Sequence, residues 1–202
     1  MQDVTAITVN YNTPDLVKRA IRSIRKFYPE LFIYVINLST DKKNIRLING
    51  ALYQINKNIG HGPGLHYGLQ RVTTKYALCF DSDIVMKRPP IEIMVERCNG
   101  KYGVGPVVQV NKFGVDVKGK NIISYLHPHF MLLNVEEYFK WHPLINHGAP
   151  CLKTMLEMHS KGRSSDLLVN MNVGEYILHE GRGTRKLNPK EFEPRNWDKI
   201  KY

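Results

Sequence analysis

Short apolar segments rich in β-branched residues alternate with helical patterns through the first eighty residues of the chain. The strand segments cover residues 4–10, 31–38, 51–56 and 76–80, and the helical patterns cover 14–28 and 60–72. Strands joined through helices pair in parallel, because the helix carries the chain back to the starting edge of the sheet. The sequence therefore predicts an α/β fold of the Rossmann-like kind, with a mixed, mostly parallel central sheet.

The remainder of the chain is less regular, but it contains no linker, internal repeat or low-complexity stretch. We expect strands at 102–110 and 173–178, one or two strands within 122–133, and a helix at 149–159. A chain of 202 residues, of which 43% are hydrophobic, is long enough to bury one core. We therefore predict a single domain over residues 1–202.

Composition narrows the class of protein further. No apolar run reaches the roughly 18 residues that a bilayer crossing needs, and the first residues resemble neither a signal nor a transit peptide. We expect a soluble protein of the cytoplasm, or of the host cytoplasm if the chain is viral. Cys79, Cys98 and Cys151 are odd in number and widely spaced, so we interpret them as small buried hydrophobes rather than as disulfide or zinc cysteines.

The chain is strongly basic, with 29 Lys and Arg residues against 18 Asp and Glu residues and a net charge of +11. The excess is shared between the two halves of the chain, so it belongs to the folded body. The first helical pattern carries a basic ridge, which consists of Lys18, Arg22, Arg25 and Lys26. Such a ridge is either a solvated helix face or a docking surface for a polyanion, such as nucleic acid or an anionic lipid layer.

Two carboxylates follow the fourth strand segment directly, in the motif Asp81-Ser82-Asp83. In an open α/β sheet, ligands bind outside the carboxyl ends of the strands, so both acids face the expected crevice. Hard divalent cations prefer oxygen ligands of this kind. The alternative is a turn in which the aspartates cap backbone N–H groups, and the position of the motif favours the metal site.

A glycine-rich turn, Asn58-Ile59-Gly60-His61-Gly62-Pro63-Gly64, opens the helical pattern that precedes this motif. Free N–H groups at the start of a helix attract phosphate, and His61 and His66 add donors. An ordinary strand-to-helix turn is the alternative, and the spacing matches neither a P-loop nor a dinucleotide fingerprint.

His179 ends the last predicted strand and precedes a glycine loop with two arginines, Arg182 and Arg185. A histidine at a strand end could complete a metal site, and the arginines could clamp a diphosphate. The other histidines lack paired zinc-ligand spacing.

Together, these motifs resemble the family-2 glycosyltransferases, enzymes of the GT-A fold that transfer a sugar from a nucleotide sugar. The segment Val9–Pro14 looks like the opening strand and turn of that family, on which the nucleoside rests. The glycine turn is similar to its Asn-x-Gly loop, Asp81–Asp83 to its Asp-x-Asp motif, and His179 to its metal-binding histidine before a flexible loop. The order and spacing of these motifs are more specific than any one of them.

The resemblance implies a divalent cation, Mn²⁺ or Mg²⁺, held by Asp83 and His179, and a nucleotide diphosphate sugar, with a UDP-sugar favoured. It divides the domain into a nucleotide-sugar-binding half (1–90), an acceptor half (91–185) and a basic C-terminal arm (186–202). The residues that would contact the donor come from all of the motifs: Tyr11, Asn12, Thr13, Asn37, Asn58, Gly60, His61, Gly64, His66, Asp81, Ser82, Asp83, Arg182 and Arg185.

Two departures from the family pattern affect the expected chemistry. Asn37 stands where the family usually has an Asp that binds the base. The Glu-Asp pair that supplies the general base of inverting members is replaced by the segment 147–150, which reads His-Gly-Ala-Pro. The candidate bases nearby are His147, Glu157 and Asp166; alternatively, the enzyme retains configuration and a leaving-group oxygen takes the proton.

The acceptor stays open between a hydroxymethylated base in DNA, as some phage glycosyltransferases use, and a cell-surface glycan or lipid-linked acceptor. The net charge of +11 suits either acceptor, and DNA is slightly favoured because no helix suited to membrane docking is evident. A non-catalytic nucleic-acid-binding α/β protein would explain the charge, but it gives no reason for the order of the motifs.

Overall fold

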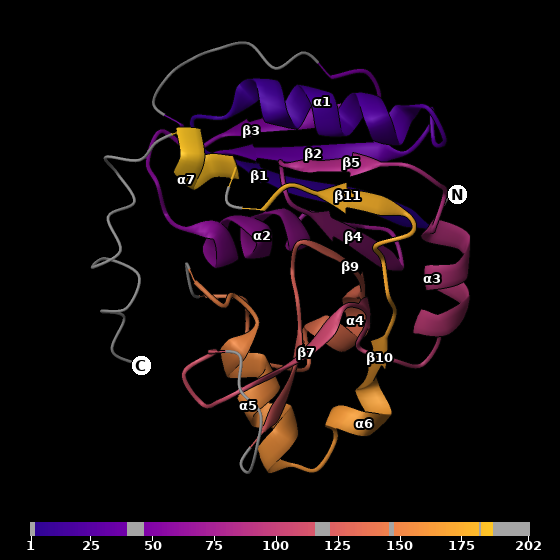
Figure 1. Cartoon of the computed structure of the whole chain (residues 1–202), viewed down its shortest axis with the longest axis vertical. Coiled ribbons are helices and arrows are strands. Elements are labelled where there is room, and N and C mark those ends of the chain that lie inside the picture. The colour runs from indigo at the N-terminus through magenta and orange to yellow at the C-terminus, as the bar shows by residue number, and fades with distance from the viewer. Residues whose placement is uncertain (1–2, 40–46, 116–121, 146–147, 182, 188–202) are drawn as a thin grey trace.

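A computed structural model describes residues 3–39, 47–115, 122–145, 148–181 and 183–187. Its centre is a seven-stranded sheet, drawn in Figure 1. Across the sheet the strands are β10 (Leu168–Asn170), β6 (Gly103–Gly105), β9 (Phe130–Asn134), β4 (Tyr76–Phe80), β1 (Val4–Asn10), β2 (Phe32–Asn37) and β3 (Gly50–Gln54). The pairs β3–β2, β2–β1, β1–β4 and β10–β6 are parallel, whereas β9 runs antiparallel to both of its neighbours. The predicted mixed, mostly parallel sheet is confirmed.

Two hydrophobic clusters cover the two faces of this sheet. One cluster contains α1 (Pro14–Arg25), α3 (Ile91–Cys98) and the small sheet of β5 (Ile84–Met86) and β11 (Ile177–His179). The other contains α2 (His61–Leu69), α4 (Val135–Tyr138), α5 (Leu152–Ser160), α6 (Ser164–Leu167) and the hairpin of β7 (Val107–Val110) and β8 (Ile123–Leu126). Successive side chains of a strand point to opposite faces, so Ala6 belongs to the first cluster and Ile7 to the second.

Helix α1 begins at Pro14, a residue whose fixed φ suits the first helical position. The hydroxyl of Thr13, the residue before the helix, donates to Oδ1 of Asn10 at 3.2 Å and makes no capping hydrogen bond to the helix. At the other end of the helix, the Arg25 guanidinium donates to the carbonyls of Pro29 at 2.7 Å and Asn49 at 2.8 Å. Arg25 therefore ties the end of α1 to the chain on either side of β2.

Helix α2 packs very closely on β1, and two glycines permit this. A Cβ added at Gly64 would lie 3.0 Å from Val9, and one added at Gly68 would lie 2.6 Å from Ile7. Tight helix–sheet packing thus gives Gly64 a structural reason to be glycine. Gly60, just before the helix, has φ of 95°, a conformation that favours glycine.

Differences from the predicted elements lie mostly after residue 83. Pro106 lacks an N–H for the ladder, so the strand expected at 102–110 is divided into β6 and β7. The strand expected at 173–178 begins only at Ile177, because Gly174 and Tyr176 belong to a turn held by Asn172 and Val173. Short elements such as β5 and β10 carry too few residues to show a periodicity.

Three further expectations concern the cysteines, membrane-spanning helices and the basic C-terminal arm. All three cysteines are buried and free. Among the described helices, none combines the length and the apolar character required to cross a bilayer. Most of the predicted basic arm, residues 188–202, lies outside the described residues.

Candidate active site

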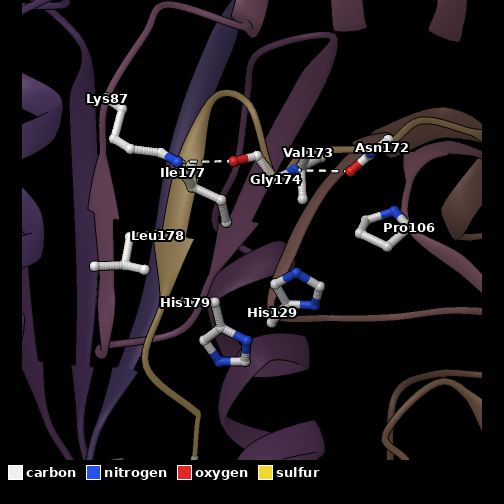
Figure 2. A pocket seen from close by; sticks show the side chains of 9 residues that line it. All are labelled: Lys87, Pro106, His129, Asn172, Val173, Gly174, Ile177, Leu178 and His179. Carbon is white, nitrogen blue, oxygen red and sulfur yellow. Dashed lines mark hydrogen bonds between the residues drawn. The ribbon is translucent and has the colours of Figure 1, made fainter.

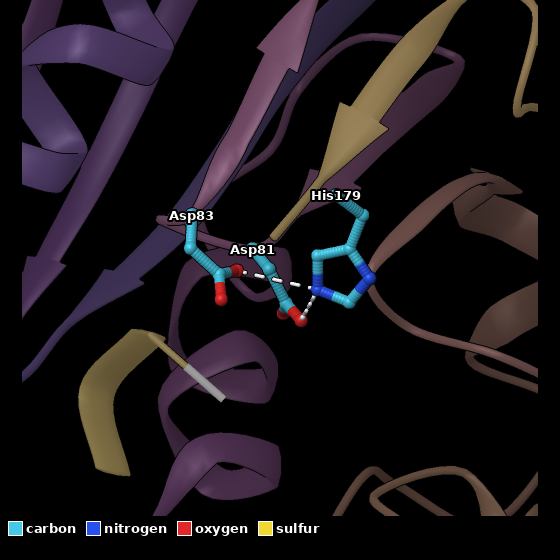
Figure 3. A group of neighbouring side chains, drawn as sticks. All are labelled: Asp81, Asp83 and His179. Atoms are coloured by element: carbon cyan, nitrogen blue, oxygen red, sulfur yellow. Dashed lines mark ion pairs between the residues drawn. The ribbon is translucent and has the colours of Figure 1, made fainter. Parts of the chain in front are cut away.

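Strand pairing brings the predicted metal ligands together. Asp81 and Asp83 lie in the link between β4 and β5, and β11 pairs antiparallel with β5 so that His179 stands opposite Ile84. Nε2 of His179 lies 3.4 Å from Oδ2 of Asp81 and 3.3 Å from Oδ1 of Asp83, as Figure 3 shows. One ligand atom from each of the three residues lies within 4.8 Å of the others. Residues about one hundred positions apart thus form one compact set of donors.

The charges in this cluster stabilise one another. Burial alone would raise the pKa of Asp81, but its hydrogen bond to His179 and the nearby charges of His61 and His179 lower it to about 2. Burial alone would lower the pKa of His179, but its hydrogen bonds to Asp81 and Asp83 raise it to about 9. The metal-free site therefore holds an imidazolium between two carboxylates at neutral pH.

The segment that follows β11 folds back over Asp83, which is 5% exposed. The amide of Gly183 donates to Oδ2 of Asp83 at 2.8 Å, and the amide of Glu180 donates to its carbonyl at 3.2 Å. The Glu180 carboxylate pairs with Arg19 of α1 at 2.8 Å. Figure 1 shows α7 (Gly183–Leu187) near the end of α1 at which that helix begins. The return segment thus closes one side of the site.

The glycine turn supplies a second histidine to Asp81. Nε2 of His61, the first residue of α2, lies 3.4 Å from Oδ1 of Asp81. His66, also predicted to meet the donor, lies one turn further along, and its Nδ1 is 2.7 Å from the Tyr138 hydroxyl. Burial lowers the pKa of His66. The turn and the Asp-x-Asp motif therefore meet through His61. Their shared role in binding the donor stays a prediction.

Side-chain amides, of which those of Asn10 and Asn37 are buried, join the carboxyl ends of β1, β2 and β3, where the nucleoside is predicted to rest. Asn37 is 1% exposed; its Oδ1 accepts from Nδ2 of Asn10 at 2.7 Å, and its Nδ2 donates to Oε1 of Gln54 at 2.6 Å. The Ser39 hydroxyl accepts from the amide of Asn12, which adopts φ of 55°. Asn37 thus lies at the predicted place and braces the turn at Asn12, with its own side chain engaged inside the protein.

A His-Pro-His turn between β8 and β9 adds two histidines to the site, and sequence reasoning missed both. The ring of His129 stacks on that of His179, with centroids 4.5 Å apart and planes 8° from parallel. Nδ1 of His129 lies 2.7 Å from Nδ1 of His127. Burial, together with the nearby charges of His127 and His179, lowers the pKa of His129 to about 4. The available signal was the pair of histidines at i and i+2 between two predicted strands.

An open groove of about 440 Å³ lies beside His179 and His129, along β11. Figure 2 shows its upper part, where Nζ of Lys87 donates to the carbonyl of Gly174 and Asn172 accepts from the amide of Gly174. The residues that line it mix apolar and polar side chains without a carboxylate: Lys87, Pro106, His129, Asn172, Val173, Gly174, Ile177, Leu178 and His179. The donor cluster and the groove thus share a wall.

Two of the candidate general bases, Glu157 and Asp166, form ion pairs with neighbouring basic side chains. Glu157 pairs with Lys161 at 2.6 Å and accepts from the amide of His142, and Asp166 pairs with Arg163 at 3.5 Å. Figure 1 places α5 and α6 at the lower end of the molecule, away from α7. His147 and Arg182, and the side chain of Arg185, lie outside the described residues. The identity of the base therefore stays a prediction.

Known proteins that resemble this chain in sequence or fold include a mouse enzyme and two microbial enzymes. A mouse β-1,4 N-acetylgalactosaminyltransferase 2 is 30% identical over 94 residues, which are 46% of this chain and 18% of that protein. A mannosyltransferase from Pyrobaculum calidifontis, solved with GDP-Man and Mn²⁺, superposes with a TM-score of 0.60 at 13% identity, over 84% of this chain and 54% of the other. Glucosyl-3-phosphoglycerate synthase from Mycobacterium tuberculosis, solved with phosphoglyceric acid, gives 0.62 at 14% identity, over 92% and 75%.

These likenesses define the class of the domain as a GT-A fold, as the sequence predicted. Residues 5–159 match the family model of glycosyl transferase family 2. The chain belongs to glycosyl transferase family 2. It spans about a fifth of the mouse relative and about half of the mannosyltransferase.

Proposed function

We propose that this protein is a metal-dependent glycosyltransferase of the hexosyltransferase type, which moves a sugar from a nucleotide diphosphate sugar to a hydroxyl acceptor. The observation that carries the proposal is the cluster of Asp81, Asp83 and His179 at the carboxyl ends of a GT-A sheet. In open α/β sheets this edge is where ligands bind. Family membership and the Mn²⁺ and GDP-Man in the mannosyltransferase structure support the same conclusion.

The residues of the cluster fit a divalent cation. Carboxylate oxygens with one imidazole nitrogen are a donor set that Mn²⁺ and Mg²⁺ accept. Asp83 and His179 would hold the ion, and Asp81 would contact the ribose or the sugar. When bound, the ion stabilises the negative charge that develops on the departing diphosphate.

The donor nucleotide rests, in this proposal, across the ends of β1 and α2. The turn at Asn12 and Thr13 is fixed by Asn10 and Ser39, so it is formed before the donor arrives. His61, the first residue of α2, lies 3.4 Å from Asp81, where the diphosphate would meet the cation. The nucleotide is a UDP or a GDP derivative, with UDP favoured.

The acceptor lies in the groove on the other side of His179. Lys87, Asn172 and His129 offer polar groups along it, and none of the described residues that line it is acidic. The net charge of +11 supports a polyanionic acceptor such as DNA that carries hydroxymethylated bases. The name of the mouse relative, an N-acetylgalactosaminyltransferase, supports a glycan acceptor instead.

Thermal unfolding with nucleotides tests the donor proposal. Ligands that bind only the folded state increase the free energy of unfolding, by about 2.7 kcal/mol at a concentration of 100 times Kd, and thereby raise the Tm. We expect UDP or GDP to raise the Tm in Mn²⁺ and to lose most of this effect in EDTA. A chain that neither nucleotide protects in Mn²⁺ would contradict the proposal.

Duplex DNA binding separates the acceptor classes and the non-catalytic alternative. A DNA-directed protein should lose affinity steeply between 50 and 200 mM salt. Steep loss together with nucleotide protection supports the DNA acceptor, whereas nucleotide protection without DNA binding supports the glycan. DNA binding without nucleotide protection would favour the non-catalytic protein.

A further inference from the structure

His129 touches the candidate metal site at two points, although it is not one of the three clustered donors. Its ring stacks on His179 at a centroid distance of 4.5 Å, and its carbonyl accepts the amide hydrogen of Asp81 at 2.9 Å. One residue is thus fixed both to the backbone of a carboxylate and to the face of the imidazole. Figure 2 shows the His129 ring beside that of His179 on the wall of the groove.

Contacts with His127 fix the orientation of the His129 ring. The backbone N–H of His129 donates to Nδ1 of His127 at 3.3 Å, so Nδ1 of His127 is an acceptor. The two Nδ1 atoms also lie 2.7 Å apart, so the ring of His129 is in direct contact with that of His127. His127 itself meets the edge of Tyr125, with ring centroids 6.0 Å apart. The stacked face of His129 is consequently held in one position.

His179, by contrast, has little else to fix its ring when it acts as a ligand. It ends a strand of three residues and precedes Gly181, which has φ of 63°. Its Nε2 faces the two aspartates, where a cation would lie. The face of its ring lies against the His129 ring, with the planes 8° from parallel.

We propose that His129 is a positioning residue for the metal site, which holds the His179 imidazole in the plane that directs its Nε2 toward both aspartates. The proposal rests on the metal site of the proposed function. Residues that orient ligating histidines typically change metal affinity by about 10- to 100-fold when they are removed. The aromatic face acts here in place of the usual hydrogen bond.

Mn²⁺ titration of three variants tests this role, with binding followed by the loss of the free Mn²⁺ electron paramagnetic resonance signal. His129→Phe keeps a stacked ring, His129→Leu keeps apolar volume without one, and His129→Ala removes both. We expect Leu and Ala to weaken Mn²⁺ affinity about tenfold or more and Phe to stay within about threefold of wild type. His159→Ala, on the exposed end of α5, is the matched control and should leave affinity unchanged.

The titration distinguishes failure of the positioning role from failure of the proposed metal site. If wild type binds Mn²⁺ and His129→Leu binds it equally well, the positioning role is wrong while the metal site stands. If His129→Phe binds as weakly as His129→Leu, the stacked ring is not the feature that acts. If the wild-type chain binds no Mn²⁺, the metal site itself is wrong and the positioning role falls with it. Should His129→Ala fail to fold, the comparison of Leu with Phe decides alone.

Discussion

The backbone amide of Gly183 donates a hydrogen bond of 2.8 Å to Oδ2 of Asp83, which leaves Oδ1 facing Nε2 of His179. The two residues are one hundred positions apart, and the contact excludes any side chain at position 183. A Cβ there would lie 2.7 Å from the Cβ of Asp83 and 2.9 Å from Leu16. The return segment is therefore part of the support of the Asp83 carboxylate.

We predict that Gly183→Ala weakens Mn²⁺ binding by about tenfold, because the methyl group displaces either the amide or the carboxylate. Gly181→Ala is the control: it strains a positive φ of 63°, but its Cβ would meet nothing within 4 Å. Mn²⁺ titration of both variants measures the effect. Equal affinities in the two variants would show that the contact at Asp83 does not matter for the ion.

We predict that the Asn37 side chain stabilises the fold through its hydrogen bonds to Asn10 and Gln54 at the carboxyl ends of β1–β3. Asn37→Ala removes the shorter of the two hydrogen bonds of the buried Asn10 Nδ2, which keeps only its 3.2 Å contact to the Ser39 hydroxyl, and the loss of such a bond costs about 1 kcal/mol. Urea unfolding should show this loss of free energy of unfolding. Asn56→Ala, in the exposed loop after β3, should change it by less than about 0.5 kcal/mol. A loss of similar size in both variants would contradict the role of the network.

The ion pairs of His179 predict how the stability of the metal-free protein depends on pH. The pKa of His179 rises from 6.5 to about 9 on folding, so its contribution is complete below pH 6.5 and is lost as pH rises through about 9. The pKa of Asp81 falls from 3.8 to about 2, so its contribution is complete above pH 3.8 and is lost as pH falls through about 2. The free energy of unfolding, measured by urea unfolding in EDTA, should fall by about 1–3 kcal/mol between pH 6.5 and 9. His179→Gln should remove most of this loss, and an unchanged pH profile in that variant would oppose the assignment.

The basic ridge separates into a structural and an exposed part. Arg25 donates to the backbone carbonyls of Pro29, which precedes β2, and of Asn49, which precedes β3, whereas Arg22 and Lys26 are exposed. We predict that Arg25→Ala lowers the free energy of unfolding by about 1–3 kcal/mol. The double change of Arg22 and Lys26 to Ala should leave stability within about 0.5 kcal/mol and reduce the salt slope of duplex DNA binding, if DNA is the acceptor. A reversed pattern in the two variants would assign docking to Arg25 instead.

The elements that the sequence predicted best are those whose form depends on residues close together in the chain. The segment 76–80 is apolar throughout and is buried at every position, and Pro14 starts a helix where its ring suits the first turn. The partnership of Asp83 with His179 could be expected from motif order, since both follow strands. The contribution of His129 could not, because the stack depends on the antiparallel placement of β9 beside β4 and of β11 beside β5. Such neighbours are set by tertiary topology and leave no local periodicity.

Release of nucleoside diphosphate from UDP- and GDP-sugars in Mn²⁺, compared between wild type and Asp83→Asn, tests the central claim most directly. The Asn side chain can still accept the Gly183 amide, so the variant removes the ligand charge while it keeps the contact. We predict release by wild type and at least about a hundredfold slower release by the variant. Equal rates in the two proteins at saturating Mn²⁺ would contradict the account.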